Sequence, residues 1–96
     1  MKRKFKHRGV FYVYILECAD GIYYTGSTND LEKRIKEYND SKRGAKYTRD
    51  RRPIKLVYVK EYKYYKNAIK TERKLKRLPR RRKEELIGIY GRKRTE

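Results

Sequence analysis

Cysteine and histidine are nearly absent from this chain, which has one of each, Cys18 and His7. A single cysteine excludes internal disulfides and cysteine-rich metal sites, so we expect Cys18 to pack in the core. The low cysteine content also fits the reducing cytosol. We therefore expect a cytoplasmic location, including association with the nucleoid. The single histidine excludes a histidine-based metal site and a His-dependent catalytic triad. Any site must therefore be built from other residue types.

Long hydrophobic runs are also missing. The longest apolar stretch, residues 10–16, is too short to span a membrane and has no signal-peptide cleavage context. A chain of 96 residues makes one domain with one modest core. We expect a basic N-terminal extension over residues 1–9, the domain over residues 10–91 and a charged C-terminal tail over residues 92–96.

Acidic residues are scarce beside basic ones: 12 Asp and Glu oppose 30 Lys and Arg, giving a net charge of +18. Basic residues run the whole length, so the folded domain itself is basic, and such a surface repels itself unless a polyanion binds it. Nucleic acid is the first expected partner. An anionic membrane surface is second, and it is disfavoured because no predicted helix combines a basic face with a long apolar one.

The hydrophobic patterns that are present predict a small α+β domain. Its expected order is β-β-α-β-α-α, which gives a three-stranded antiparallel sheet flanked by helices. The expected elements are a hairpin over residues 10–26, a helix within 27–39 capped by Thr28 or Asn29, a basic loop over 40–53, a strand over 54–62, and helices over 64–78 and 80–90 ending at Gly91.

The turn of the hairpin decides how two of its tyrosines are arranged. A two-residue Asp-Gly turn would pair Glu17 with Tyr24 and place Tyr14 and Tyr24 on opposite faces. A three-residue loop, with Gly21 at positive φ, would pair Leu16 with Tyr24 and place both tyrosines on one face. Strand tyrosines usually have a core or edge role, so the hairpin pattern alone leaves the question open.

Glu72 interrupts the apolar stripe of its helix, four residues after Ala68 and three before Leu75. A carboxylate at such a position needs a cation, a hydrogen-bond network or a metal ion as its partner. The simpler alternative is a surface ion pair with Lys76, one turn later.

Arg34 interrupts the stripe of the first helix in the same way, beside Leu31 and Ile35. Its planar guanidinium suits a phosphate. The more common arrangement is an arginine whose stem packs while its head reaches water.

The loop cations, interleaved with a tyrosine, resemble a phosphate-tracking surface with a stacking ring. The alternative is a solvated charge run. The residues predicted to bind nucleic acid are Lys42, Arg43, Lys46, Tyr47, Arg49, Arg51 and Arg52 in the loop, and Arg73 and Lys76 on the later helix.

These motifs together resemble the GIY-YIG nuclease family over about residues 10–88. Tyr12-Val13-Tyr14 and Tyr24-Thr25-Gly26 are similar to its two signature triplets. Arg34 matches the family's catalytic arginine, Tyr38 a position usually Tyr or His, and the helix of Glu72 the one that carries the metal-binding glutamate. Gly44–Arg49, Arg52-Pro53 and Leu56–Tyr58 are similar to the loop and strand of the small stand-alone members. The matching elements are spread through the chain as follows: Tyr12–Tyr14, Tyr24–Gly26, Arg34, Tyr38, Gly44–Arg49, Arg52–Pro53, Leu56–Tyr58 and Ala68–Lys76.

The chain departs from the family pattern at a few positions. Tyr12 replaces the Gly of the first triplet and Thr25 the Ile of the second. Ser27 stands where some repair-nuclease relatives carry a lysine. No asparagine matches the one that many relatives place after the glutamate helix.

The resemblance implies a metal-dependent endonuclease that hydrolyses phosphodiester bonds in DNA, with low sequence specificity and structure selectivity in repair or recombination. Glu72 would hold one Mg²⁺ or Mn²⁺, and Arg34 would neutralise charge on the phosphate. Tyr14, its pKa lowered by nearby cations, would be the general base, with Tyr24 and Tyr38 as orienting groups.

This site needs Tyr14 and Tyr24 on one face, so the resemblance favours the three-residue loop and gives Gly21 and Gly26 structural roles. Two alternatives stay open. One is a non-catalytic protein that retains the fold and binds DNA or RNA, for example on the ribosome. The other is an accessory domain of a repair complex in which a partner protein supplies specificity.

Overall fold

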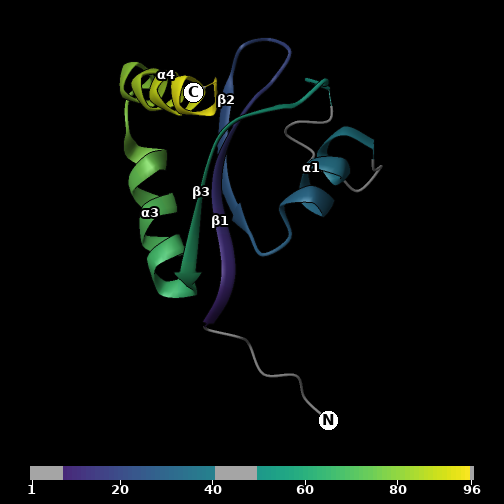
Figure 1. Ribbon diagram of the computed structural model, residues 1–96. Coiled ribbons are helices and arrows are strands. Elements are labelled where there is room, and N and C mark those ends of the chain that lie inside the picture. Colours follow the sequence, from purple (N-terminus) through teal and green to yellow (C-terminus); the bar gives the residue numbers. More distant parts are fainter. Residues whose placement is uncertain (1–7, 41–49, 96) are drawn as a thin grey trace.

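A computed structural model of the chain describes residues 8–40 and 50–95 (Figure 1). The sheet has the order β2-β1-β3 with antiparallel pairs, so the predicted α+β fold and its β-β-α-β-α-α order are confirmed. The elements are β1 (Arg8–Glu17), β2 (Tyr23–Thr28), α1 (Leu31–Asp40), β3 (Lys55–Tyr64), α3 (Tyr65–Arg77) and α4 (Arg80–Thr95).

Helices cover both faces of the sheet, α1 on one face and α3 with α4 on the other (Figure 1). β1 lies in the centre, so its successive side chains point alternately into two cores. The α1-side core contains Tyr14, Leu16, Cys18, Tyr38 and Ile54, and the α3-side core contains Phe11, Val13, Ile15, Ala68 and Leu75. Cys18 therefore packs in the core, as predicted.

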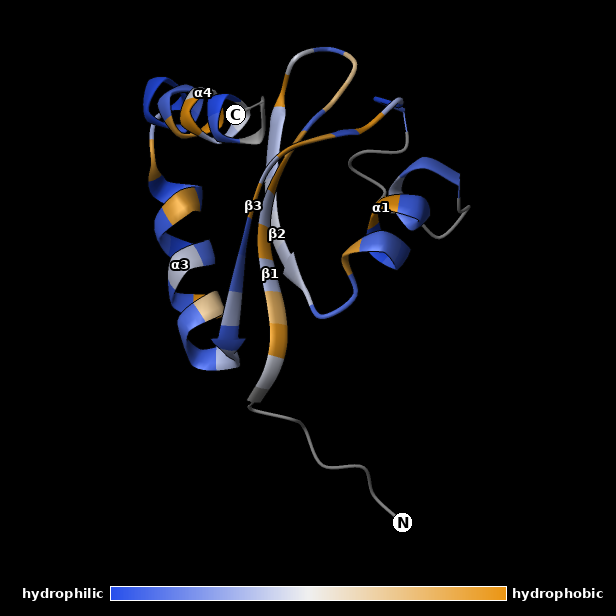
Figure 2. Cartoon of the chain, in the orientation of Figure 1, coloured by the Kyte–Doolittle hydropathy of each residue, from blue (hydrophilic) through white to orange (hydrophobic). Residues whose placement is uncertain are grey.

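Hydrophobic residues gather along β1, whereas α1 and α3 are hydrophilic over most of their outer surface (Figure 2). This arrangement reconciles a strongly polar composition with a packed interior, because one central strand supplies half of the buried residues of the two cores. Within the described residues, no helix has the length and apolar character needed to cross a membrane.

The hairpin has the predicted three-residue loop. Leu16 pairs with Tyr24, the Cys18 N–H donates to the Ile22 carbonyl at 2.9 Å, and Gly21 has φ +85°. Glycine adopts that backbone conformation without the steric penalty of other residues. The resulting register places Tyr14 and Tyr24 on the same face, toward α1.

Several element ends differ from prediction by one or more residues, and three of the differences have a structural reason. Asp30, not Thr28 or Asn29, caps α1, since its carboxylate accepts from the Lys33 N–H at 3.2 Å. Gly91 does not stop α4, which continues to Thr95, because the helix needs no positive φ there. β1 begins at Arg8, inside the predicted extension, because Arg8 pairs with Tyr64 of β3.

Candidate active site

Three tyrosines meet under α1. The Tyr14 and Tyr38 hydroxyls lie 3.1 Å apart, within hydrogen-bond distance, and the Tyr24 and Tyr38 rings are 5.6 Å apart between centroids and 69° from parallel. Tyr14 is 1% exposed and Tyr38 4%, while Tyr24 is only partly buried. The two strands and the helix therefore bring together the three tyrosines that the sequence singled out.

Gly26 makes room for the ring of Tyr14. A Cβ placed at Gly26 would lie 2.6 Å from the Tyr14 hydroxyl oxygen and 2.8 Å from Cζ, far inside ordinary contact distance. The phenol of Tyr14 thus extends from the central strand across the backbone of the edge strand β2. This close approach explains why a residue without a side chain stands at position 26.

The tyrosine protons are held tightly. Burial raises the pKa of Tyr14, and its hydrogen bond with Tyr38 and the charge of Arg34 only partly oppose that rise. Burial also raises the pKa of Tyr38, and hydrogen bonds to Tyr14 and Tyr24 raise it further. The pKa of Tyr14 therefore moves upward, opposite to the lowering that we expected from nearby cations.

Glu72 approaches the site from the α3 side of the sheet. Its Oε1 accepts a hydrogen bond of 2.5 Å from the Ser27 hydroxyl, and its Oε2 lies 2.8 Å from the Lys76 ammonium. Its side chain is 16% exposed, much less than the 56% of Lys76. The ion pair considered from the sequence is therefore present, but Glu72 is also tied to the edge strand and partly shielded from water.

The tyrosines and Glu72 belong to opposite faces of the sheet, yet they approach each other around the edge strand β2. Both Arg34 and Glu72 are near enough for their charges to shift the pKa of Tyr14, the arginine lowering it and the glutamate raising it. Arg34 stands on α1 with a side chain 47% exposed, 3.8 Å from Glu37. The charges of Arg34 and Glu72, which stand on opposite faces of the sheet, therefore both influence Tyr14.

The residues predicted to bind nucleic acid divide into three groups. Lys42, Arg43, Lys46, Tyr47 and Arg49 lie outside the described residues. Arg73 and Lys76 are exposed on α3.

The last two, Arg51 and Arg52, are engaged within the protein. Arg51 forms an ion pair with Asp20 in the hairpin turn. Arg52 donates to the Tyr38 carbonyl at 2.5 Å, at the end of α1. Both arginines thus hold the segment before β3 against the elements that carry the tyrosines.

Ser27 is a site residue that sequence reasoning missed. We treated it only as a departure from the family pattern, whereas its hydroxyl binds the Glu72 carboxylate. The signal was available in the hairpin register: Ser27 pairs with Val13, and strand alternation places it on the face opposite to Tyr24 and Gly26. That face is the one that α3 covers.

The oxygen chemistry of this edge suits a small divalent cation. Mg²⁺ binds through one or two carboxylates and completes its shell with water and substrate phosphate. Glu72 and Ser27 provide hard oxygen donors there. Across the described ranges, no group of three or more His, Cys, Asp or Glu residues gathers around a common point, so a cation would depend on water and phosphate for its other ligands.

Comparison with known proteins decides the family. The GIY-YIG catalytic domain matches residues 10–85. This chain belongs to the GIY-YIG family. The family is one of nucleases, which act on nucleic acid and generally use divalent metal ions.

Relatives of similar size show the same small GIY-YIG domain. The UPF0213 protein BH0048 of Halalkalibacterium halodurans is 48% identical over 80 residues, covering 83% of this chain and 84% of that protein. The UPF0213 protein CPE1444 of Clostridium perfringens is 51% identical over 77 residues, covering 80% and 82%.

Solved structures agree with the GIY-YIG fold. The solution NMR structure of UPF0213 protein BH0048 from Bacillus halodurans gives a TM-score of 0.58 at 46% identity, covering 86% of this chain and 87% of that one. The solution NMR structure of EF2693 from E. faecalis gives 0.61 at 34% identity, covering 91% and 92%.

Proposed function

We propose that this GIY-YIG protein is a metal-dependent endonuclease that hydrolyses phosphodiester bonds in DNA with little sequence specificity. The observation that supports it most is Glu72, a partly shielded carboxylate in a protein of net charge +18. A protein that only binds nucleic acid gains nothing from an acidic group facing a polyanion. Hydrolysis, in contrast, needs a group that can hold a cation against the phosphate.

Glu72 would hold one Mg²⁺ or Mn²⁺, with Ser27 fixing the orientation of its carboxylate. When bound, the cation supplies charge neutralisation at the phosphate and at the leaving 3′ oxygen. Lys76 shares the Glu72 carboxylate and would have to release Oε2. Arg34, across the edge strand, would neutralise the equatorial oxygens as charge develops on them.

The tyrosines divide their roles by burial. Tyr14 keeps its proton because burial raises its pKa, so it acts as a hydrogen-bond donor and positioning group. Tyr38 fixes it through the 3.1 Å contact between hydroxyls. Tyr24, which is partly exposed and packs on Tyr38, is the tyrosine that water reaches, and we assign it the orientation of the attacking water.

The test is nicking of supercoiled plasmid and cleavage of branched DNA by purified protein, with Mg²⁺ or Mn²⁺ and with EDTA. We expect metal-dependent cleavage that Glu72→Ala lowers by about 100-fold or more, since removal of transition-state charge stabilisation has effects of that order. DNA binding should persist in Glu72→Ala. Cleavage in EDTA, or undiminished cleavage by Glu72→Ala, would contradict the metal role.

The same assay distinguishes the nuclease from the alternative of a non-catalytic protein that only binds nucleic acid. The +18 charge predicts tight, strongly salt-dependent binding in either case. A protein that binds DNA or RNA but cuts neither, with any tested cation, would retain the fold of the family without its activity.

A further inference from the structure

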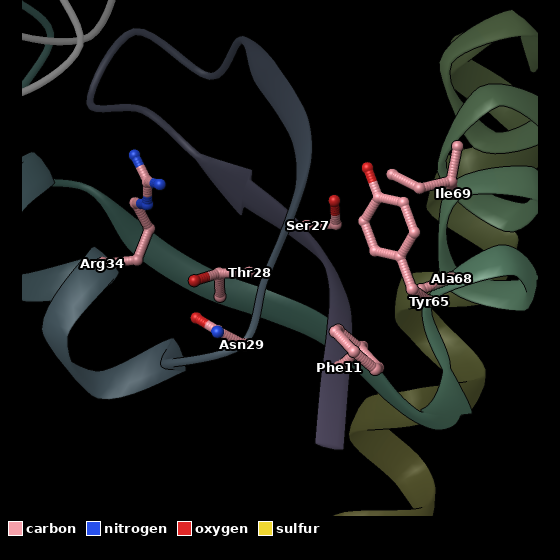
Figure 3. Close-up of a pocket in the computed structure, with 8 residues that line it drawn as sticks. All are labelled: Phe11, Ser27, Thr28, Asn29, Arg34, Tyr65, Ala68 and Ile69. Carbon is pink, nitrogen blue, oxygen red and sulfur yellow. The ribbon is translucent and has the colours of Figure 1, made fainter. Parts of the chain in front are cut away.

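A pocket of about 280 Å³ lies beside the candidate active site and includes side chains that the proposed hydrolysis does not use. Figure 3 shows Arg34 at one side of it and Tyr65 with Ile69 at the other, with Thr28 and Asn29 in between. The pocket thus crosses the end of the edge strand β2, from α1 to α3. Among the described residues that line it, none is acidic.

One half of the pocket is aromatic and apolar. Tyr65, the first residue of α3, is 37% exposed, and its ring packs on Phe11 at 5.7 Å between centroids with 65° between planes. Phe11 is buried, so it contacts the Tyr65 ring from the protein interior and fixes its position. Part of the Tyr65 residue stays accessible to solvent. A supported and accessible aromatic ring in a basic protein is a surface on which a nucleobase can stack.

The other half of the pocket is polar. Asn29 is exposed at the wall of the pocket. Its side-chain amide has hydrogen-bond donors and an acceptor, which can pair with the donors and acceptors along the edge of a nucleobase. Arg34 lines the same wall and carries the guanidinium that suits a phosphate. Stacking ring, amide and cation are the three kinds of group that a nucleotide requires.

The pocket is continuous with the candidate active site. Tyr65, Ala68, Ile69 and Glu72 follow one another at helical spacing on a single face of α3. Tyr65 and Glu72 are seven residues apart, which corresponds to about 10 Å along a helix axis. Ser27 lines the pocket and also binds the Glu72 carboxylate, so pocket and site share a wall.

We infer that this pocket is a nucleotide subsite, in which Tyr65 stacks on one nucleobase of a DNA strand while Arg34 holds that strand's phosphate. The inference rests on the proposed function for its ligand, DNA. A base inside a duplex is already stacked, so the base that enters must be unpaired or turned out of the helix. Tyr65 and Asn29 then determine which positions on a DNA strand the protein prefers.

A second hollow continues the path outward. It shares Tyr65 with the pocket and is lined by Tyr64, Lys66, Asn67 and Lys70. Two lysines at this hollow can follow the DNA backbone beyond the subsite. Tyr64, 46% exposed, lines this hollow and not the pocket, which makes it a matched control for Tyr65.

The test measures binding without hydrolysis, by fluorescence anisotropy in EDTA. It compares a DNA duplex with one bulged adenine, the same duplex with an abasic residue in the bulge, and the fully paired duplex. The first two have the same backbone charge, so their difference isolates the base. Wild-type protein should prefer the adenine bulge over the abasic one by about fivefold or more, the size of one stacking contact.

Tyr65→Ala should remove that preference, Tyr65→Phe should keep it, and Asn29→Ala should reduce it. Tyr64→Ala should lower affinity for all three duplexes alike and leave the ratio unchanged. Equal wild-type binding of adenine and abasic bulges would overturn the subsite without recourse to any variant. So would a full preference retained by a folded Tyr65→Ala protein.

This assay can fail separately from the nuclease proposal. A base preference that depends on Tyr65, in a protein that never cuts DNA, would support the subsite and reject the hydrolysis. Metal- and Glu72-dependent cleavage with no base preference in EDTA would do the reverse.

Discussion

The two faces of the sheet are built on different principles. The α1 side buries phenol groups, with the Tyr14 and Tyr38 hydroxyls paired 3.1 Å apart inside the core. The α3 side buries Phe11, Val13 and Ile15 against a helix, and its charged residue, Glu72, lies at the margin. The α1 face therefore holds its candidate site tyrosines inside the protein, whereas the α3 face holds its candidate site carboxylate, Glu72, at the edge.

The difference shows how so small a domain can assemble a site. Arg34 and the buried tyrosines lie on the α1 face, whereas Glu72, the candidate metal ligand, lies on the α3 face. At the edge strand β2, Tyr14 extends across Gly26 on the α1 face, and the next residue, Ser27, binds Glu72 on the α3 face. Four predictions test this contrast between the buried tyrosine hydroxyls of the α1 face, here called the polar core, and Glu72 at the edge of the α3 face.

The largest effect should come from glycine. Gly26→Ala should lower the free energy of unfolding by about 1–3 kcal/mol, because its Cβ collides with the buried phenol of Tyr14. Gly91→Ala, in α4 with nothing within 4 Å of the added Cβ, should raise stability by about 0.5–1 kcal/mol. Chemical denaturation of both variants checks the opposite signs. Equal effects would show that Tyr14 does not lie against Gly26.

High pH should weaken the polar core. The pKa values of Tyr14 and Tyr38 are raised by burial, so above about pH 10 the unfolded chain loses phenol protons that the folded chain retains. The contribution of these two protonated tyrosines to the free energy of unfolding is therefore fully present below about pH 10. Above that pH the free energy of unfolding falls by about 1.4 kcal/mol per pH unit for each such tyrosine. Urea denaturation from pH 8 to 11 measures the slope. The double variant Tyr14→Phe/Tyr38→Phe should have a shallower slope, and an unchanged slope would contradict the assignment.

Removal of one buried hydroxyl group from each face of the sheet should change the stability of the protein in opposite directions. Tyr38→Phe should destabilise the protein by about 1 kcal/mol, because it leaves the buried Tyr14 hydroxyl without that partner. Thr25→Val should stabilise it by about 1 kcal/mol, since the Thr25 hydroxyl is buried on the α3 side with no hydrogen-bond partner. Thermal melts of the two variants measure both shifts.

The smallest effect on stability should come from the ion pair of Glu72 at the edge of the α3 face. Lys76→Met removes the ion pair between the exposed Lys76 and the partly shielded Glu72, and it should change stability by no more than about 0.5 kcal/mol. It should nevertheless strengthen Mn²⁺ binding in a calorimetric titration with DNA present, because Glu72 Oε2 is released. Lys74→Met, an exposed lysine on the same helix, is the control. Identical Mn²⁺ affinity in both variants would exclude competition by Lys76.

Sequence reasoning succeeded where local pattern determines structure. The apolar pattern and the turn residues predicted the hairpin, but they left its turn length open, and the resemblance to the GIY-YIG family was needed to choose the loop that places Tyr14 and Tyr24 on one face. Sequence reasoning failed where the outcome depends on tertiary surroundings. The pKa of Tyr14 follows burial that no sequence window reveals, and the partner of Glu72, Ser27, comes from 45 residues away.

Helix ends were the other weak point. Asp30 and its neighbours Thr28 and Asn29 are all good caps by type, and only the backbone decides among them. Gly91 resembled a stop signal, but it does not have the positive φ of a helix-terminating glycine, and α4 continues through it to Thr95.

The most direct test of the central claim, that groups from both faces act as one site at β2, is single-turnover cleavage of DNA by four proteins. These are the wild type, Arg34→Ala, Glu72→Ala and the double variant, each with saturating Mn²⁺. We predict that each single change removes most of the rate and that the double variant is no slower than the slower single variant, as for groups that act as a unit. A wild-type rate in either single variant would contradict the claim.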